Sequence, residues 1–242
     1  MKLMLIGGGE VGRGNSAYET KEIDEEIVRM ANTDKPNFLF IGLASNFSDS
    51  YYDTMKKIYS DLGCNCAYLK KKNIINNRNI VEEKIKNADI IYMCGGDTVK
   101  LVNDLKNYDL VSLLKIAVNE NKVLVGISAG AIALANKGYS DSLKLRGESD
   151  KFEFIDGLGI INIIFSPHHT QEKKKELLSE IEDKKVYSLE DNTALKIIDN
   201  NYEIIKSKQE NDAYIITKEE VKLLPNNGII KENRWVKRLK RN

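Results

Sequence analysis

Short apolar runs alternate with amphipathic segments along the first half of the chain. The apolar runs span residues 2–6, 37–43, 66–69, 88–94 and 122–127. The amphipathic segments between them lie at about residues 21–32, 51–62, 79–87, 99–106 and 110–121. Short apolar runs separated by helical segments are typical of parallel strands that are buried on both faces. The pattern predicts right-handed βαβ units, and hence an α/β fold with an open, mostly parallel sheet flanked by helices.

The pattern changes in the second half of the chain. Residues 137–155 are polar and irregular, an apolar strand is expected at 159–165, and a strongly charged helix is expected at 171–181. Short alternating segments follow at 185–189, 194–198, 202–205, 213–217 and 220–223. Alternation punctuated by turn residues predicts a small antiparallel C-terminal extension. Because no repeat or linker interrupts the chain, we expect a single domain over residues 1–242, with the basic tail at 234–241 as a solvated end.

Composition and charge exclude several classes of protein. The 37 basic and 36 acidic residues nearly cancel, so no global field indicates binding to nucleic acid or to an anionic membrane. The three cysteines, Cys64, Cys66 and Cys94, fit neither a disulfide framework nor a paired zinc pattern. No signal-peptide pattern opens the chain, and no apolar run reaches the ~18 residues of a membrane span. We therefore expect a cytoplasmic protein without metal or cofactor, and the choice between monomer and homodimer stays open.

Glycines and small polar residues follow several of the predicted strands. They form the loops Gly7–Gly9, Ala44–Asn46 and Gly95–Thr98, and Ser128 follows the strand at 122–127 in the same way. Ligands on an open parallel sheet bind at the carboxyl ends of its strands, so these loops are expected to converge on one cleft. Gly7–Gly9 is similar to a dinucleotide-binding turn, but its spacing is imperfect and no helical apolar stripe follows it. We favour a tight turn beside the cleft over a nucleotide site.

The most informative motif is Gly126-Ile127-Ser128-Ala129-Gly130, between an apolar strand and a helix that starts with small residues. A serine in a tight strand-to-helix turn fits the G-x-S-x-G nucleophile elbow. Such a turn exposes the hydroxyl, and the first N–H groups of the helix face the position where an oxyanion develops. The motif predicts Ser128 as a nucleophile, with oxyanion donors from the backbone of Ala129 and of Gly95 or Gly96.

A serine nucleophile needs a base, and the chain has only two histidines, His168 and His169. We favour His168, because it directly follows Pro167, whose ring restricts the backbone. The third member of a triad is a carboxylate that accepts a hydrogen bond from the imidazole. The candidates are Asp141, Glu148, Asp150, Asp156, Glu190 and Asp191. Asp141 lies among small polar residues between the nucleophile and the base, whereas Glu190 and Asp191 read more naturally as a turn.

In order and spacing, these motifs resemble the peptidase E and cyanophycinase family of serine peptidases, whose fold is related to class I glutamine amidotransferases. The resemblance covers about residues 2–195 and is carried by Ile6–Gly9, Cys94–Thr98, Gly126–Ala131, Tyr139–Ser142, Ser166–His169 and Leu189–Leu195. It implies hydrolysis of small peptides through an acyl-enzyme. By position it implies Ser128 as nucleophile, His168 as base and Asp141 as acid. It also implies Gly96 and Ala129 as the oxyanion donors.

The resemblance bears on substrate choice as well. Peptidase E removes an N-terminal aspartate from dipeptides, which implies an arginine soon after the histidine to bind the substrate carboxylate. Here that region, Thr170–Lys175, holds no arginine. Arg146 and Lys173 are the predicted substitutes, and Arg13 is a third cation in a loop at the same edge. The missing arginine also supports an alternative, a non-catalytic ligand-binding or regulatory protein on the same fold.

Overall fold

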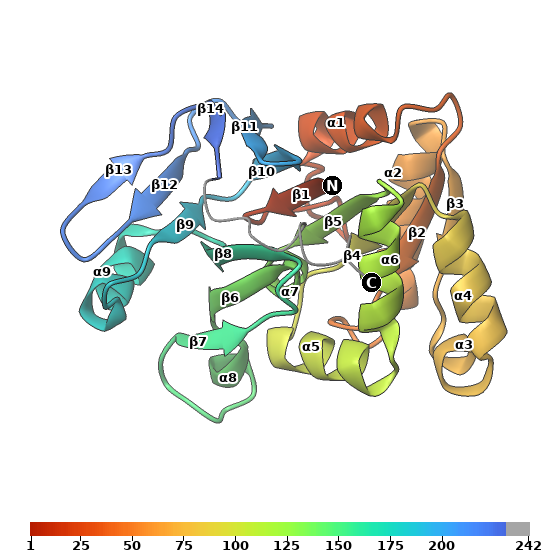
Figure 1. Ribbon diagram of the computed structural model, residues 1–242, viewed down its shortest axis with the longest axis horizontal. Helices are drawn as coiled ribbons and strands as arrows, with labels where there is room; N and C mark the ends of the chain where they lie inside the picture. The colour runs from red at the N-terminus through yellow and green to blue at the C-terminus, as the bar shows by residue number, and fades with distance from the viewer. Residues whose placement is uncertain (231–242) are drawn as a thin grey trace, which may run out of the picture.

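The computed structural model describes residues 1–230, and this part of the chain forms two mixed sheets flanked by helices (Figure 1). The larger sheet has eight strands in the order β14-β11-β10-β1-β5-β4-β2-β3. Its parallel part comprises β1 (Lys2–Ile6), β5 (Val123–Ile127), β4 (Ile90–Met93), β2 (Asn37–Ile41) and β3 (Asn65–Tyr68). Antiparallel strands β10 (Thr193–Ile198), β11 (Asn201–Lys206) and β14 (Asn227–Ile229) extend it. The predicted α/β fold, with a mostly parallel sheet and an antiparallel C-terminal extension, is confirmed.

Helices follow the parallel strands, as the apolar pattern predicts. They are α1 (Lys21–Ala31), α2 (Asp49–Asp61), α3 (Lys71–Asn76), α4 (Arg78–Asn87), α5 (Thr98–Asn107) and α6 (Leu110–Asn119). Ile23, Ile27 and Met30 of α1 are buried, which is the four-then-three spacing of one helix face. Helix α1 packs against β4 and β5, α2 against β2 and β3, and α6 against β5. The sheet is therefore covered by amphipathic helices that each bury one stripe.

The second sheet was not predicted. It has six strands in the order β13-β12-β9-β8-β6-β7. Strands β6 (Ala135–Ser140), β7 (Glu153–Asp156), β8 (Ile161–Ser166), β9 (Val186–Leu189), β12 (Ala213–Ile216) and β13 (Val221–Leu223) form it, with helices α8 (Ser142–Leu145) and α9 (Gln171–Glu180). The segment expected to be irregular, 137–155, thus contains two strands and a helix. Its polar strand β6 is stabilised by ladders to β7 and β8, a tertiary effect that overrides the weak local propensity.

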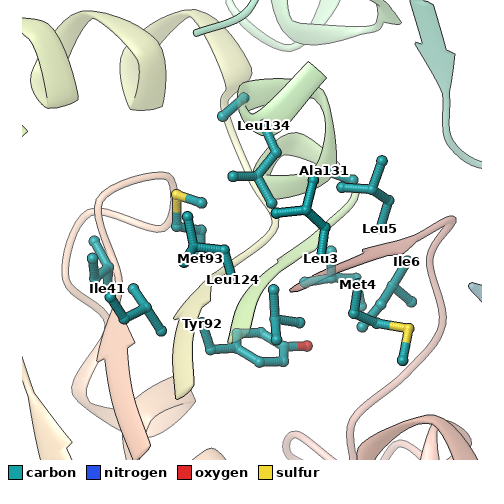
Figure 2. Close-up of a cluster of buried hydrophobic side chains, with 14 of the residues drawn as sticks. Leu3, Met4, Leu5, Ile6, Ile41, Tyr92, Met93, Leu124, Ala131 and Leu134 are labelled. Atoms are coloured by element: carbon teal, nitrogen blue, oxygen red, sulfur yellow. The ribbon is translucent and has the colours of Figure 1, made fainter. Parts of the chain in front are cut away.

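Helix α7 (Ala129–Leu134) lies between the two sheets. All six of its residues are buried, and it contacts β1, β4 and β5 of the larger sheet as well as β6 and β8 of the smaller one. Figure 2 shows Ala131 and Leu134 packed with Met93 and Leu5. A Cβ on Gly126 would lie only 2.2 Å from the carbonyl carbon of Gly130, so larger residues would push the helix off the strand. The small residues of the motif therefore let α7 fit this narrow space.

The carboxyl ends of strands from both sheets meet at one edge. Strands β1, β4 and β5 deliver the glycine loops and Ser128 there, and β8 and β9 deliver the loops at 167–169 and 190–192. None of the helices in residues 1–230 has the length and apolar character to cross a membrane. The tail predicted to be solvated, 234–241, lies outside the described residues.

Candidate active site

Ser128 occupies the strand-to-helix turn that the motif predicts. Its backbone has φ 52° and ψ −109°, a strained conformation for a residue with a side chain. Its N–H donates to the Ile6 carbonyl at 3.0 Å, and its carbonyl accepts from the N–H of Ile132 at 3.1 Å. Strain of this kind costs about 1–3 kcal/mol and persists only where the surroundings fix the backbone. The turn holds the Ser128 hydroxyl out of the helix and into a cavity.

His168 links this hydroxyl to a carboxylate. Its Nε2 lies 2.9 Å from Ser128 Oγ, and its Nδ1 lies 2.6 Å from Asp191 Oδ1. A carboxylate accepts a hydrogen bond from protonated Nδ1, which leaves Nε2 of the neutral ring as an acceptor for the serine proton. The three side chains form the chain of hydrogen bonds that general-base activation of a serine requires.

The backbone around His168 is held by neighbouring loops. His168 has φ 51°, its N–H donates to the Gly7 carbonyl at 2.9 Å, and the next N–H, of His169, donates to Leu189 O at 2.9 Å. Gly8 packs directly against the pair. A Cβ at this position would lie 2.0 Å from Asp191 Oδ1 and 2.4 Å from His168 Cε1. The glycine turn after β1 therefore makes room for the histidine and its carboxylate.

The carboxylate bonded to His168 is not the one that the sequence predicts. Asp141 lies at the N-cap of α8, after β6, while the carboxylate bonded to His168 is Asp191. The reason is strand order: β9 pairs in parallel with β8, so the loop after β9 lies beside the loop that carries His168. Glu190, the neighbouring candidate, points elsewhere and accepts from the Asp212 N–H and the Tyr214 hydroxyl. The geometry therefore favours Asp191 over Asp141 as the carboxylate partner of His168.

Ser128 and His168 face a cavity of about 300 Å³ at the sheet edge. Its lining consists of Gly8, Gly9, Glu10, Arg13, Glu19, Ser45, Tyr51, Gly95, Gly96, Ile127, Ser128, His168 and Asp191. Gly96 thus lies on the cavity wall, and Ala129 follows Ser128 as the first residue of α7. The first N–H groups of a helix lack acceptors within it, so that of Ala129 is suited to an oxyanion.

The two cations predicted to bind substrate lie outside the cavity lining. Arg146 pairs with Glu148 at 2.9 Å and contacts Asp97 at 4.0 Å. Lys173 is only 4% exposed, and its Nζ donates to the Pro167 carbonyl. Both side chains are engaged by neighbouring groups of the protein. Neither side chain lines the cavity in which Ser128 lies.

Arg13 is the cation that does line the cavity. Its side chain is about half exposed, and its guanidinium lies 4.3 Å from the centre of the Tyr51 ring. Glu10 lies 3.9 Å from the Arg13 guanidinium. Glu10 and Glu19 line the same cavity, and sequence reasoning missed both of them and Tyr51. The signal that would have found the two glutamates is their position in the loop between β1 and α1, which leaves the carboxyl end of β1 where ligands bind.

The side chain of His169, the other histidine, is buried in the protein. Its ring is 6% exposed, stacks on Tyr214 with 4.2 Å between centroids, and lies with Nδ1 2.8 Å from Ser188 Oγ. Burial, together with the nearby Lys174 and Lys173, lowers its pKa to about 4, so the ring is neutral at pH 7.

Residues 1–230 contain no group of three or more His, Cys, Asp or Glu side chains arranged to bind a metal ion.

A family model and one of the relatives match this chain over most of its length. The model of Peptidase family S51 matches residues 3–205. An uncharacterized peptidase, YgaJ of Bacillus subtilis, is 26% identical over 220 residues, which are 88% of this chain and 91% of that protein. A peptidase E of Haemophilus influenzae is 32% identical over 92 residues, or 38% of this chain and 39% of that protein.

Two solved structures share the fold. A peptidase from an acI-B1 Actinobacterium has a TM-score of 0.72 and 21% identity, covering 95% of this chain and 96% of that one. A putative peptidase E from Listeria monocytogenes has a TM-score of 0.64 and 19% identity, with 85% and 98% covered. The family model spans most of the chain, and both structures repeat its architecture. The chain belongs to peptidase family S51.

Proposed function

We propose that the protein is a serine exopeptidase of small peptides, with Ser128 as nucleophile, His168 as general base and Asp191 as the acid of the triad. The observation that supports this most directly is the hydrogen-bonded sequence from Asp191 through His168 to Ser128, at distances of 2.6 and 2.9 Å. The strained backbone of Ser128 and the cavity in front of it add to that support.

In the proposed reaction, Ser128 Oγ attacks the carbonyl carbon of the scissile peptide bond while His168 Nε2 takes the hydroxyl proton. Asp191 stabilises the imidazolium, and the N–H groups of Ala129 and Gly96 bind the oxyanion. The imidazolium then protonates the leaving amine, which gives the acyl-enzyme. Water, deprotonated by the same imidazole, hydrolyses the ester and restores the serine.

The charges in the cavity support recognition of a dipeptide with an N-terminal aspartate. Arg13 supplies a guanidinium for the side-chain carboxylate, in place of Arg146 and Lys173, and stacking on Tyr51 orients it. Glu10, which is 3.9 Å from Arg13, and Glu19, which is 2.6 Å from Lys208, line the cavity where a free α-ammonium group would bind. The resemblance of the sequence motifs to the peptidase E family implies the same substrate class.

The test is hydrolysis of Asp-Leu, Asn-Leu and Ala-Leu by the wild type and by Ser128→Ala, Arg13→Ala and Arg146→Ala. Ser128→Ala should be inactive on all three. We expect Asp-Leu to be preferred by about 10- to 100-fold in kcat/KM, since Arg13 is half exposed and solvent screens part of the ion pair. Arg13→Ala should remove the preference, and Arg146→Ala, a matched change outside the cavity, should keep it.

Different results of these assays would refute the aspartyl preference and the peptidase activity. Equal wild-type rates on the three dipeptides would refute the aspartyl preference and leave the peptidase chemistry intact. If no peptide is cleaved and a fluorophosphonate does not modify Ser128, the non-catalytic alternative is favoured.

A further inference from the structure

Lys173 is a buried cation outside the cavity. It is the third residue of α9 and is 4% exposed. Its Nζ donates to the Pro167 carbonyl at 2.5 Å and lies 4.8 Å from the centre of the Phe152 ring and 5.9 Å from that of Tyr139. Among the described residues, no carboxylate makes an ion pair with this ammonium. A carbonyl oxygen and aromatic faces are its immediate partners.

Folding stability alone does not favour a lysine here. Burying an ammonium with no carboxylate at ion-pair distance is costly, and a cation in the first turn of a helix opposes the helix dipole. An apolar side chain of similar length would fill the same space beside Phe152 and Tyr139 without these costs. The lysine therefore points to a role other than stabilising the fold.

The group that Lys173 holds is the peptide unit directly before His168. The carbonyl of this unit, from Pro167, accepts from Lys173, and its N–H, from His168, donates to Gly7 O at 2.9 Å. The unit is thus bound at both ends. It leads into a residue with φ 51°, a left-handed conformation that a histidine keeps only where its surroundings impose it.

We propose that Lys173 is a positioning residue: its ammonium, bound to the Pro167 carbonyl, fixes the peptide that carries His168 and so keeps the imidazole against Ser128 and Asp191. This inference rests on the proposed function of that site. Without the ammonium, the peptide unit loses one of its two hydrogen bonds and can rotate, which moves the ring away from Ser128 Oγ.

The positive charge of Lys173 should strengthen its hydrogen bond to the Pro167 carbonyl, because an ammonium is a stronger donor than a neutral amine. Burial lowers the pKa of Lys173 to about 8, against the opposing effects of Asp141, Asp191 and Glu176. Lys144 lies over the same Phe152 ring at 4.4 Å. The ammonium is therefore present at neutral pH and loses its proton as the pH rises through about 8.

The experiment compares Lys173→Met and Lys173→Arg with Lys175→Met, an exposed position on the same helix. We expect Lys173→Met to lower kcat by about 10- to 100-fold, the size of effect that small misplacement of a reacting group produces. Its KM should stay within about threefold, because Lys173 does not line the cavity. Lys175→Met should have wild-type constants. The wild-type kcat should decline above pH 8, whereas Lys173→Arg should keep its own kcat to higher pH.

Wild-type kcat in Lys173→Met would overturn the inference. If that variant does not fold, a wild-type kcat that stays constant up to pH 9.5 would overturn it instead. Failure of the proposed function is distinguished by a fluorophosphonate that leaves wild-type Ser128 unmodified. A crystal structure of Lys173→Met then decides without activity: a His168 ring displaced from Ser128 supports the inference, and an unchanged 2.9 Å contact overturns it.

Discussion

Replacing Asp191 with asparagine removes the charge next to His168 with little change in volume. The carboxylate is 2.6 Å from Nδ1 and its side chain is about half exposed. Over about 4 Å between charge centres, the attraction to an imidazolium is roughly 4 kcal/mol at an effective dielectric constant near 20 and roughly 1 kcal/mol in water. For a half-exposed pair we take about 2 kcal/mol, which corresponds to about 30-fold in rate.

The tautomer of the His168 ring in Asp191→Asn sets the upper limit of the loss in kcat. If the amide oxygen faces Nδ1, only the charge is lost, and kcat should fall by about 30-fold. If the amide NH₂ faces Nδ1, the ring must carry its proton on Nε2, which can then no longer accept the serine proton. The loss then approaches about 10⁴-fold, as for a triad aspartate replaced by asparagine.

The assay measures steady-state kcat on a dipeptide for Asp191→Asn and Asp141→Asn in parallel, with thermal unfolding as the control for folding. Asp141→Asn should keep kcat within about threefold, because its carboxylate is not bonded to His168. A large loss in Asp141→Asn with near-normal kcat in Asp191→Asn would refute the assignment made from the structure.

Three further variants test the surroundings of the site. Gly8→Ala should lower kcat by about 100-fold or more, because its methyl group would displace Asp191, whereas Gly63→Ala, with open space around the added Cβ, should not. His169→Gln should remove a pH dependence of stability: with a folded pKa of about 4 against 6.5, the wild type should lose about 3 kcal/mol of unfolding free energy relative to the variant as the pH falls from 6.5 to 4. Asp24→Asn should show the opposite sign, because burial raises the pKa of Asp24 to about 6 and the wild type gains about 2 kcal/mol relative to that variant between pH 7 and 4. Urea unfolding across this range checks both, and a constant difference from either variant contradicts the burial argument for that residue.

Local pattern was sufficient for the part of the fold that carries Ser128. The apolar run ending at Ile127 and the small residues after it specify strand, turn and helix by themselves, and the structure places β5 and α7 there. The sequence also allowed Ser128 to be paired with one of only two histidines, because both directly follow the apolar run that forms β8.

The local sequence pattern could not predict which strands and side chains lie next to each other. Asp191 meets His168 because β9 pairs with β8 in parallel, and the sequence of β9 reads equally well as one strand of an antiparallel extension. Likewise, no local signal shows that Lys173 is directed inward to the Pro167 carbonyl while Arg13 remains in the cavity. Strand order and side-chain direction depend on long-range packing, which a single sequence does not reveal.

Ser128 is proposed to act as a nucleophile that His168 activates. The most direct test is peptide mapping by mass spectrometry after reaction with a fluorophosphonate, which a serine attacks efficiently only when a base takes its proton. We expect one adduct, on Ser128, in the wild type, none at this position in Ser128→Ala, and a rate reduced by about 10³-fold or more in His168→Ala. A wild-type protein that stays unmodified at Ser128, or that reacts equally fast after His168→Ala, would contradict the claim.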